Sequence, residues 1–142
     1  IALFDSLVRT VRAGRRVAFC TLVDARGSTP QTPGASLLLH EDMRTEGTLG
    51  GGCVEAEVWD AAREVIRTGK PKHLSFNLGQ DAAYDNGLIC GGQLEVFVEA
   101  IVPQPKAYIF GAGHISKSLC KVASLADFAP TVIDNIVTAT LP

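Results

Sequence analysis

The stretch GTLGGGCVEAEVWDAAREVIRTGK, residues 47–70, places three consecutive glycines and a cysteine directly before a segment with helical periodicity. Its apolar side chains recur three or four positions apart, as one face of a helix requires: Val54, Val58, Ala61, Ala62, Val65 and Ile66. We therefore expect a strand-to-helix junction at Gly50, Gly51, Gly52 and Cys53, with the helix ending at Gly69. A glycine run is costly in conformational entropy, so it indicates a close backbone approach that side chains would block.

The segments before this junction predict one helix and then strands. Apolar residues at helical spacing predict an amphipathic helix over residues 2–13, whose apolar stripe should face a sheet. The run VAFCTLV, residues 17–23, is apolar on both faces and predicts a strand covered on both sides. A loop rich in Gly and Pro is expected over residues 24–35, followed by a strand at SLLLH, residues 36–40, and a brief strand before the glycines.

The segments after the helix predict two more strands. Apolar and polar residues alternate over residues 72–78 and again over residues 93–100, as in half-buried strands. A polar loop, residues 79–92, separates them and ends in Cys90, Gly91 and Gly92. The sequence VPQP, residues 102–105, is expected to be a linker.

The region that begins at Lys106 predicts a strand, a turn with two glycines, a helix and a second strand. Gly111 and Gly113 occupy the first two positions of a G-x-G-x-x-G pattern, Ser116 stands at the third, and Asp134 ends the second strand. Such a turn is typical of folds that hold a pyrophosphate on backbone N–H groups and a ribose on an acidic residue. NAD is therefore a candidate ligand, preferred over NADP because Asp134 would repel a 2′-phosphate. A unit of the same fold without a nucleotide is the alternative.

Together these patterns predict an α/β protein in two parts. Residues 1–101 are expected to form a mixed α/β domain, and residues 106–142 a truncated Rossmann-like domain that holds only its first βαβ unit. The chain starts at Ile1 rather than Met and stops at Pro142 in mid-pattern, so we expect both native termini to lie outside this sequence.

Composition excludes several classes of protein. The 13 Lys and Arg against 15 Asp and Glu leave no basic surface for nucleic acid or an anionic membrane. No apolar run approaches the roughly 20 residues that span a bilayer. Hydrolase and NTPase motifs such as G-x-S-x-G and the P-loop are missing from the sequence. The four cysteines are widely spaced, which favours reduced thiols in a cytoplasmic protein.

Cys53 and Cys90 are the candidate ligand-binding cysteines. A helix N-terminus lowers the pKa of a thiol, so Cys53 could act as a thiolate or a metal ligand, although Glu55 and Glu57 oppose this effect. Glu55 is also a candidate cap for the free N–H groups of the helix. Cys90 likewise lies beside glycines. Both cysteines either pack at crowded turns or share a site for a sulfur-bearing or anionic ligand; an autonomous metal site is not expected.

Four motifs, in order along the chain, resemble the XdhC/CoxI family. They are GSTPQTPGA at 27–35, GTLGGGCVEAEV at 47–58, CGGQLEVFVE at 90–99 and YIFGAGHIS at 108–116. The resemblance implies an accessory protein that binds molybdenum cofactor, assists its sulfuration by a cysteine desulfurase and delivers it to a xanthine dehydrogenase-type apo-enzyme. It also implies that Cys53 and Cys90 contact the cofactor or its metal, together with the adjacent glycines: Gly50, Gly51, Gly52, Gly91 and Gly92.

A carrier is favoured over a catalyst, and two alternatives remain open. An NAD-dependent oxidoreductase is supported by Gly111, Gly113 and Asp134, but the sequence offers no convincing acid/base pair for it. A ligand-free scaffold that binds the target enzyme would use the glycine loops only to shape its surface. Either a monomer or a homo-oligomer is compatible with the sequence.

Overall fold

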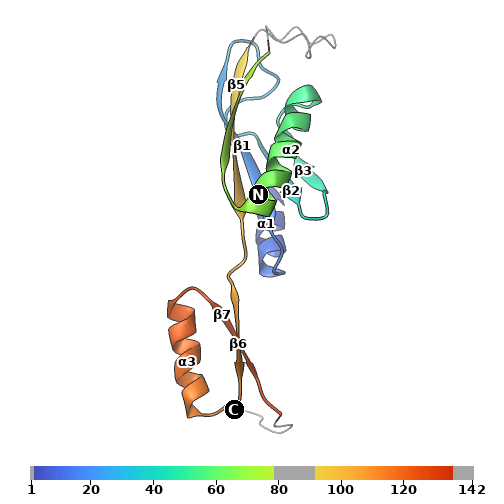
Figure 1. Cartoon of the computed structure of the whole chain (residues 1–142). Helices are drawn as coiled ribbons and strands as arrows, with labels where there is room; N and C mark the ends of the chain where they lie inside the picture. The colour runs from blue at the N-terminus through green and yellow to red at the C-terminus, as the bar shows by residue number, and fades with distance from the viewer. Residues whose placement is uncertain (1, 79–91, 136–142) are drawn as a thin grey trace. The chain divides into compact units, whose positions relative to one another are not determined.

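The computed structural model describes residues 2–78 and 92–135 (Figure 1). The chain divides into two compact units, Ile1–Pro103 and Gln104–Pro142. Among the described residues, no helix combines the length and apolar character needed to cross a membrane.

A five-stranded antiparallel sheet forms the centre of the first unit, with strand order β3-β2-β1-β5-β4 (Figure 1). The mixed α/β class is thereby confirmed. The elements follow the chain as α1 (Ala2–Arg12), β1 (Val17–Arg26), β2 (Ser36–His40), β3 (Thr45–Gly47), α2 (Gly52–Thr68), β4 (Lys72–Asn77) and β5 (Gln93–Ile101).

Helix α2 covers one face of this sheet and forms the core with it. Its apolar stripe packs on alternate residues of the central strands, because successive side chains of a strand point to opposite faces. The fully buried members of this core are Ala18, Cys20, Leu22, Leu39, Leu49, Val58, Ala62, Val65, Val96 and Val98. Gly69 ends the helix with φ +70°, and its N–H bonds to the Val65 carbonyl, so the predicted helix and its stop are confirmed.

Helix α1 lies on the opposite face, and the expectation that its apolar stripe faces the sheet is wrong in part. Phe4 is 56% exposed, although its ring packs at 5.6 Å on that of Phe19. The buried side chains of the helix are instead Ser6 and Thr10. Polar partners on the sheet explain this orientation, since a buried hydroxyl must be hydrogen-bonded.

Those partners are His40 at the end of β2 and Glu46 in β3. Thr10 Oγ1 lies 3.3 Å from His40 Nδ1, and the Ser6 hydroxyl donates to Glu46 Oε1 at 2.7 Å. His40 Nε2 also lies 3.0 Å from Glu46 Oε1, without hydrogen-bond geometry. A buried polar cluster therefore fixes α1 on the sheet.

Strand β1 is longer than predicted, because it continues to Arg26 rather than ending at Val23. Pairing with β5 persists through Ala25↔Leu94 and Arg26↔Gln93, after a register shift between Leu22 and Asp24. The loop expected over residues 24–35 therefore begins only after Arg26. Cross-strand pairing stabilised polar residues that the sequence assigned to a loop.

The second unit consists of β6 (Lys106–Phe110), α3 (His114–Leu125) and β7 (Ala129–Ile133). The two strands are parallel and in register from Lys106↔Ala129 to Phe110↔Ile133. The predicted order of strand, helix and parallel strand is present. That this unit is the first βαβ of a truncated Rossmann-like domain stays a prediction, since two strands do not establish that fold.

Candidate functional site

The glycine run after β3 adopts a backbone that other residues rarely adopt. Gly50, Gly51 and Gly52 have φ values of +112°, +81° and +67°. A side chain on any of them would be strained, because the left-handed region is unfavourable for L-residues. The junction therefore depends on glycine for its conformation, whatever approaches it.

The space around these glycines differs from one to the next. A Cβ atom on Gly51 or Gly52 would meet no atom within 4 Å, so the backbone there lies open. A Cβ atom on Gly50 would lie 2.6 Å from Cγ of Pro30. The protein's own loop thus makes the close approach at Gly50, whereas Gly51 and Gly52 leave room for another molecule.

Gly92, the last residue of the second glycine pair in the sequence, lies against the same loop. A Cβ atom there would lie 2.4 Å from the Ser28 carbonyl oxygen and 2.7 Å from that of Arg26. The segment from Arg26 to Pro30 therefore lies close to both Gly50 and Gly92. Sequence reasoning missed this role of the loop; the Gly- and Pro-rich composition of residues 24–35 was the available signal.

Of the two candidate cysteines, Cys53 lies at the second residue of α2. Cys90 and Gly91 lie outside the described residues, so their contribution to a shared site stays a prediction. Among the described residues, no group of three or more His, Cys, Asp or Glu side chains could hold a metal ion.

Glu55 organises the loop that leads into α2. Its Oε1 atom accepts hydrogen bonds from the Thr48 hydroxyl at 2.6 Å, the Leu49 N–H at 2.8 Å and the Gly51 N–H at 3.0 Å. The Thr48 hydroxyl oxygen in turn accepts from the Gly50 N–H at 3.1 Å. Burial raises the pKa of Glu55, but these hydrogen bonds outweigh it and leave the pKa below its usual value.

This arrangement decides what the bend formed by Gly50, Gly51 and Gly52, here called the first bend, can bind. The N–H groups of residues 49–51 are already satisfied by a carboxylate and a hydroxyl, so they are not available as an anion-binding nest. The negative charge of Glu55 also opposes a thiolate nearby. What remains open is the bare backbone at Gly51 and Gly52, where a Cβ atom would meet no atom within 4 Å.

The turn after β6 is also closed by internal hydrogen bonds. Asp134 accepts a hydrogen bond from the Ala112 N–H, and the Ser116 hydroxyl donates to the Gly111 carbonyl. Gly111 needs its φ of +96°, whereas Gly113 is extended. The sequence assigned the Asp134 carboxylate to a ribose; in the structure it contacts the turn itself.

A groove of about 690 Å³ runs beside this turn, lined by apolar side chains and by Gly111, Gly113, His114 and Ser116. Tyr108 and Phe110 on β6 are 56% and 77% exposed. Nucleotide binding in this groove stays a prediction, because the described residues supply neither a second pair of strands nor an acidic residue directed at a ribose.

The remaining described cysteines lie elsewhere. Cys20 is fully buried in β1, where burial raises the pKa of its thiol to about 12. Cys120 is half-buried on α3 in the second unit. Both are free thiols, and the sequence-based interpretation of Cys20 as a small core residue agrees with its position in the core.

Residues 10–77 match the XdhC and CoxI family. Over 117 residues the chain is 32% identical to the uncharacterized protein YqeB of Escherichia coli strain K12, a match that covers 82% of this chain and 21% of that protein. Over 85 residues it is 33% identical to the molybdenum cofactor insertion chaperone PaoD of the same strain, covering 60% of this chain and 26% of that protein.

The chain thus spans about a fifth to a quarter of the length of these curated relatives. A crystal structure described as a xanthine dehydrogenase from Bacillus halodurans has a similar fold, with a TM-score of 0.59 and 19% sequence identity. That similarity covers 92% of this chain and 61% of the other. At this identity it shows the fold alone.

Proposed function

We propose that this chain is part of a protein that carries molybdenum cofactor. It contains a domain of the XdhC and CoxI family, as its motifs predict. The carrier would bind the cofactor, assist its sulfuration and deliver it to a xanthine dehydrogenase-type molybdenum hydroxylase. The similarity to PaoD, which is named a molybdenum cofactor insertion chaperone, supports this proposal.

The observation that carries the proposal is the open backbone at Gly51 and Gly52, immediately before Cys53. A Cβ atom at either position would meet no atom within 4 Å, so nothing in the described part of the chain blocks the close approach of a planar ring system there. Both glycines have left-handed backbone conformations, which disfavour any residue with a side chain at these positions.

In this proposal the chain holds the cofactor and performs no reaction on it. When bound, the cofactor supplies the molybdenum centre and pterin that the recipient enzyme needs. The residues of this chain supply position: Gly51 and Gly52 admit the guest, and Cys53, the next residue along the chain, is the candidate thiol. Glu55 maintains the conformation of the loop, and its carboxylate makes the site less favourable for a further negative charge.

The proposal is tested on the native full-length protein, by elemental analysis for molybdenum and by the fluorescence of oxidised pterin released on denaturation. We expect both signals in wild type after gel filtration. Cys53→Ser and Gly51→Val should reduce both, the first by removing the thiol and the second by filling the opening.

Cys120→Ser is the matched control, because it removes a half-buried thiol from the other unit and should leave both signals unchanged. Wild-type protein without pterin or molybdenum would refute the carrier function. Loss of the signals in Cys120→Ser as well would refute the assignment of the site to the first bend.

A further inference from the structure

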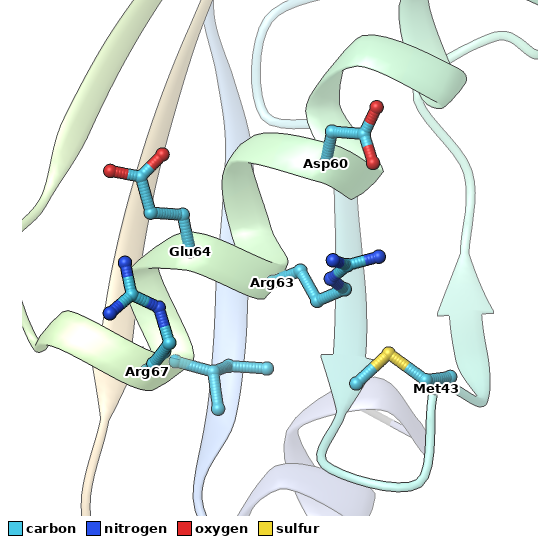
Figure 2. A pocket seen from close by; sticks show the side chains of 6 residues that line it. Met43, Asp60, Arg63, Glu64 and Arg67 are labelled. Carbon is cyan, nitrogen blue, oxygen red and sulfur yellow. The ribbon is translucent and has the colours of Figure 1, made fainter.

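A groove of about 470 Å³ lies on the first unit beside α2 (Figure 2). It is lined by two arginines, two acidic residues and two apolar residues: Met43, Asp60, Arg63, Glu64, Ile66 and Arg67. Opposite charges are equal in number there, and the Arg63 guanidinium lies over the ring of Trp59, 5.6 Å from its centroid. This groove therefore favours no particular class of partner.

The groove beside β6 in the second unit is apolar instead. Tyr108 and Phe110 line it from the strand, and Ile115 and Leu119 line it from α3. All four side chains are exposed, and Ile115 is 83% exposed. Among the described residues, no Asp, Glu, Lys or Arg side chain lines this groove. Its walls therefore suit an apolar occupant.

Helix α3 buries small side chains and exposes large ones. Its least exposed residues are Ser116, Cys120 and Ala123. Ile115, Leu119 and Val122 are exposed and recur at spacings of four and three residues, so they form one stripe along the helix. Two members of this stripe line the groove together with β6, so the stripe lies on the β6 side of the helix.

The free edge of β6 lacks the features that protect other sheet edges from pairing with a further strand. In the first unit, edge strand β3 has only three residues, and edge strand β4 begins with Lys72 and His73, which contact carboxylates. In the second unit, β7 contains Pro130, which has no N–H to donate. Strand β6, with the sequence KAYIF, carries a charge only at Lys106 and pairs with β7 alone among the described strands.

The apolar surface around this edge is large for a single chain. The exposed parts of five side chains together amount to about 600 Å², at the upper end of the apolar patches of monomeric proteins. These side chains are Tyr108, Phe110, Ile115, Leu119 and Val122. A standard interface buries about 800 Å² on each partner. The apolar area is therefore close to what a stable dimer needs, and backbone atoms of β6 would add to it.

We propose that two copies of this chain associate through the free edge of β6 and the stripe on α3. The two β6 strands would run antiparallel, because that pairing is the same viewed from either strand, as a two-fold axis requires. Tyr108, the central residue of β6, would then lie opposite its own copy. Both α3 helices would cover the same face of the joined sheet, with their stripes in contact. This association concerns the second unit and does not depend on the carrier function.

Sedimentation velocity ultracentrifugation of the purified chain measures the association. We expect wild type to have twice the mass of one chain at micromolar concentrations, in low and in high salt, since the contact is apolar. Ile115→Asp should weaken dimerisation at least about tenfold, because the two-fold axis buries the new carboxylate twice. Ile115 is exposed in a single chain, so this variant should keep the circular dichroism spectrum of wild type.

Leu125→Asp is the matched control, because it introduces the same charge on the same helix at a position that is 88% exposed and does not line the groove. It should dimerise like wild type. A wild-type chain that stays monomeric up to about 100 μM would overturn the proposal. So would undiminished dimerisation of Ile115→Asp, or an equal loss in Leu125→Asp.

Disulfide formation identifies the strand at the contact. In a Cys120→Ser background, Tyr108→Cys should give an intermolecular disulfide under mild oxidation, because directly opposed residues of antiparallel strands have the separation that a disulfide needs. Thr131→Cys is the control, since Thr131 pairs in register with Tyr108 but lies on β7, one strand further from the axis. Mass spectrometry identifies the linked peptides. A dimer linked through Thr131→Cys, or one that gives no link through Tyr108→Cys, would rule out the β6 edge as the contact.

Discussion

Oε1 of Glu55 lies 3.0 Å from the backbone nitrogen of Gly51 and accepts its hydrogen bond. One side chain in the first turn of α2 thus closes the loop that starts the helix. The same oxygen also accepts from Thr48 and Leu49, so three donors depend on a single carboxylate. This geometry makes Glu55 the residue whose removal should disturb the first bend most directly.

Glu55→Gln should destabilise the chain by about 1–2 kcal/mol at neutral pH, because hydrogen bonds to a charged acceptor are stronger than those to an amide. The folded pKa of Glu55 is lowered, so its contribution is present above the usual value of 4.5 and is lost as pH falls through the folded pKa. Urea unfolding at neutral pH and at a series of pH values below 4.5 measures both effects.

Asp60→Asn serves as the control for this prediction, since it removes a carboxylate from an exposed position of the same helix. It should change stability by less than about 0.5 kcal/mol. A stability difference between wild type and Glu55→Gln that stays constant down to low pH would show that Glu55 does not hold the loop as an ion.

Alanine substitutions should destabilise the fold by different amounts, depending on what surrounds each glycine. Gly51→Ala should cost about 1–2 kcal/mol from backbone strain alone, because its Cβ atom would enter open space. Gly50→Ala should cost more, since strain is joined by a clash with Pro30 at 2.6 Å. Gly50→Ala should therefore have a lower thermal unfolding midpoint than Gly51→Ala.

Gly92→Ala completes this series, because its Cβ atom would press on the Ser28 and Arg26 carbonyl oxygens without left-handed strain. A cost of about 1–3 kcal/mol is expected from overpacking. Gly50→Ala/Pro30→Ala should recover part of the loss caused by Gly50→Ala. Equal midpoints for Gly50→Ala and Gly51→Ala would contradict the close contact between Gly50 and Pro30.

Thr10→Val should destabilise the first unit by about 1–3 kcal/mol, although the two side chains have nearly the same shape. The change leaves Nδ1 of His40 without its partner at 3.3 Å in a site that water does not reach. Thr45→Val, an exposed β3 position, is the matched substitution and should be neutral or slightly stabilising. Chemical denaturation of both variants gives the comparison.

Cys20 should be inert toward thiol reagents in the folded protein. Burial raises the pKa of its thiol to about 12, so the reactive thiolate is scarce at neutral pH, and the side chain has no exposed surface. Mass-spectrometric mapping after brief alkylation should find Cys20 unmodified and Cys120 modified. Rapid modification of Cys20 before unfolding would mean that β1 opens locally.

Local patterns were sufficient for most elements of the fold. The stripe from Val54 to Ile66 predicted α2, and Gly69 predicted its end, because both signals act within a few residues of the chain. The orientation of α1 was not predictable in this way. Its apolar stripe is clear in the sequence, yet Ser6 and Thr10 are buried because Glu46 and His40, some 30 to 40 residues away, provide their hydrogen bonds.

The candidate site shows the same difference between features set by local sequence and features set by long-range contacts. The sequence by itself marked the glycines, the position of Cys53 at a helix start and the role of Glu55 as a cap, since these follow from the backbone needs of a single junction. Only the tertiary structure decided that Pro30 fills the space at Gly50 while the backbone at Gly51 stays open, and that Arg63 and Met43 share a groove. Those relationships join segments far apart along the chain, and the packing of a loop or a turn against α2 sets them.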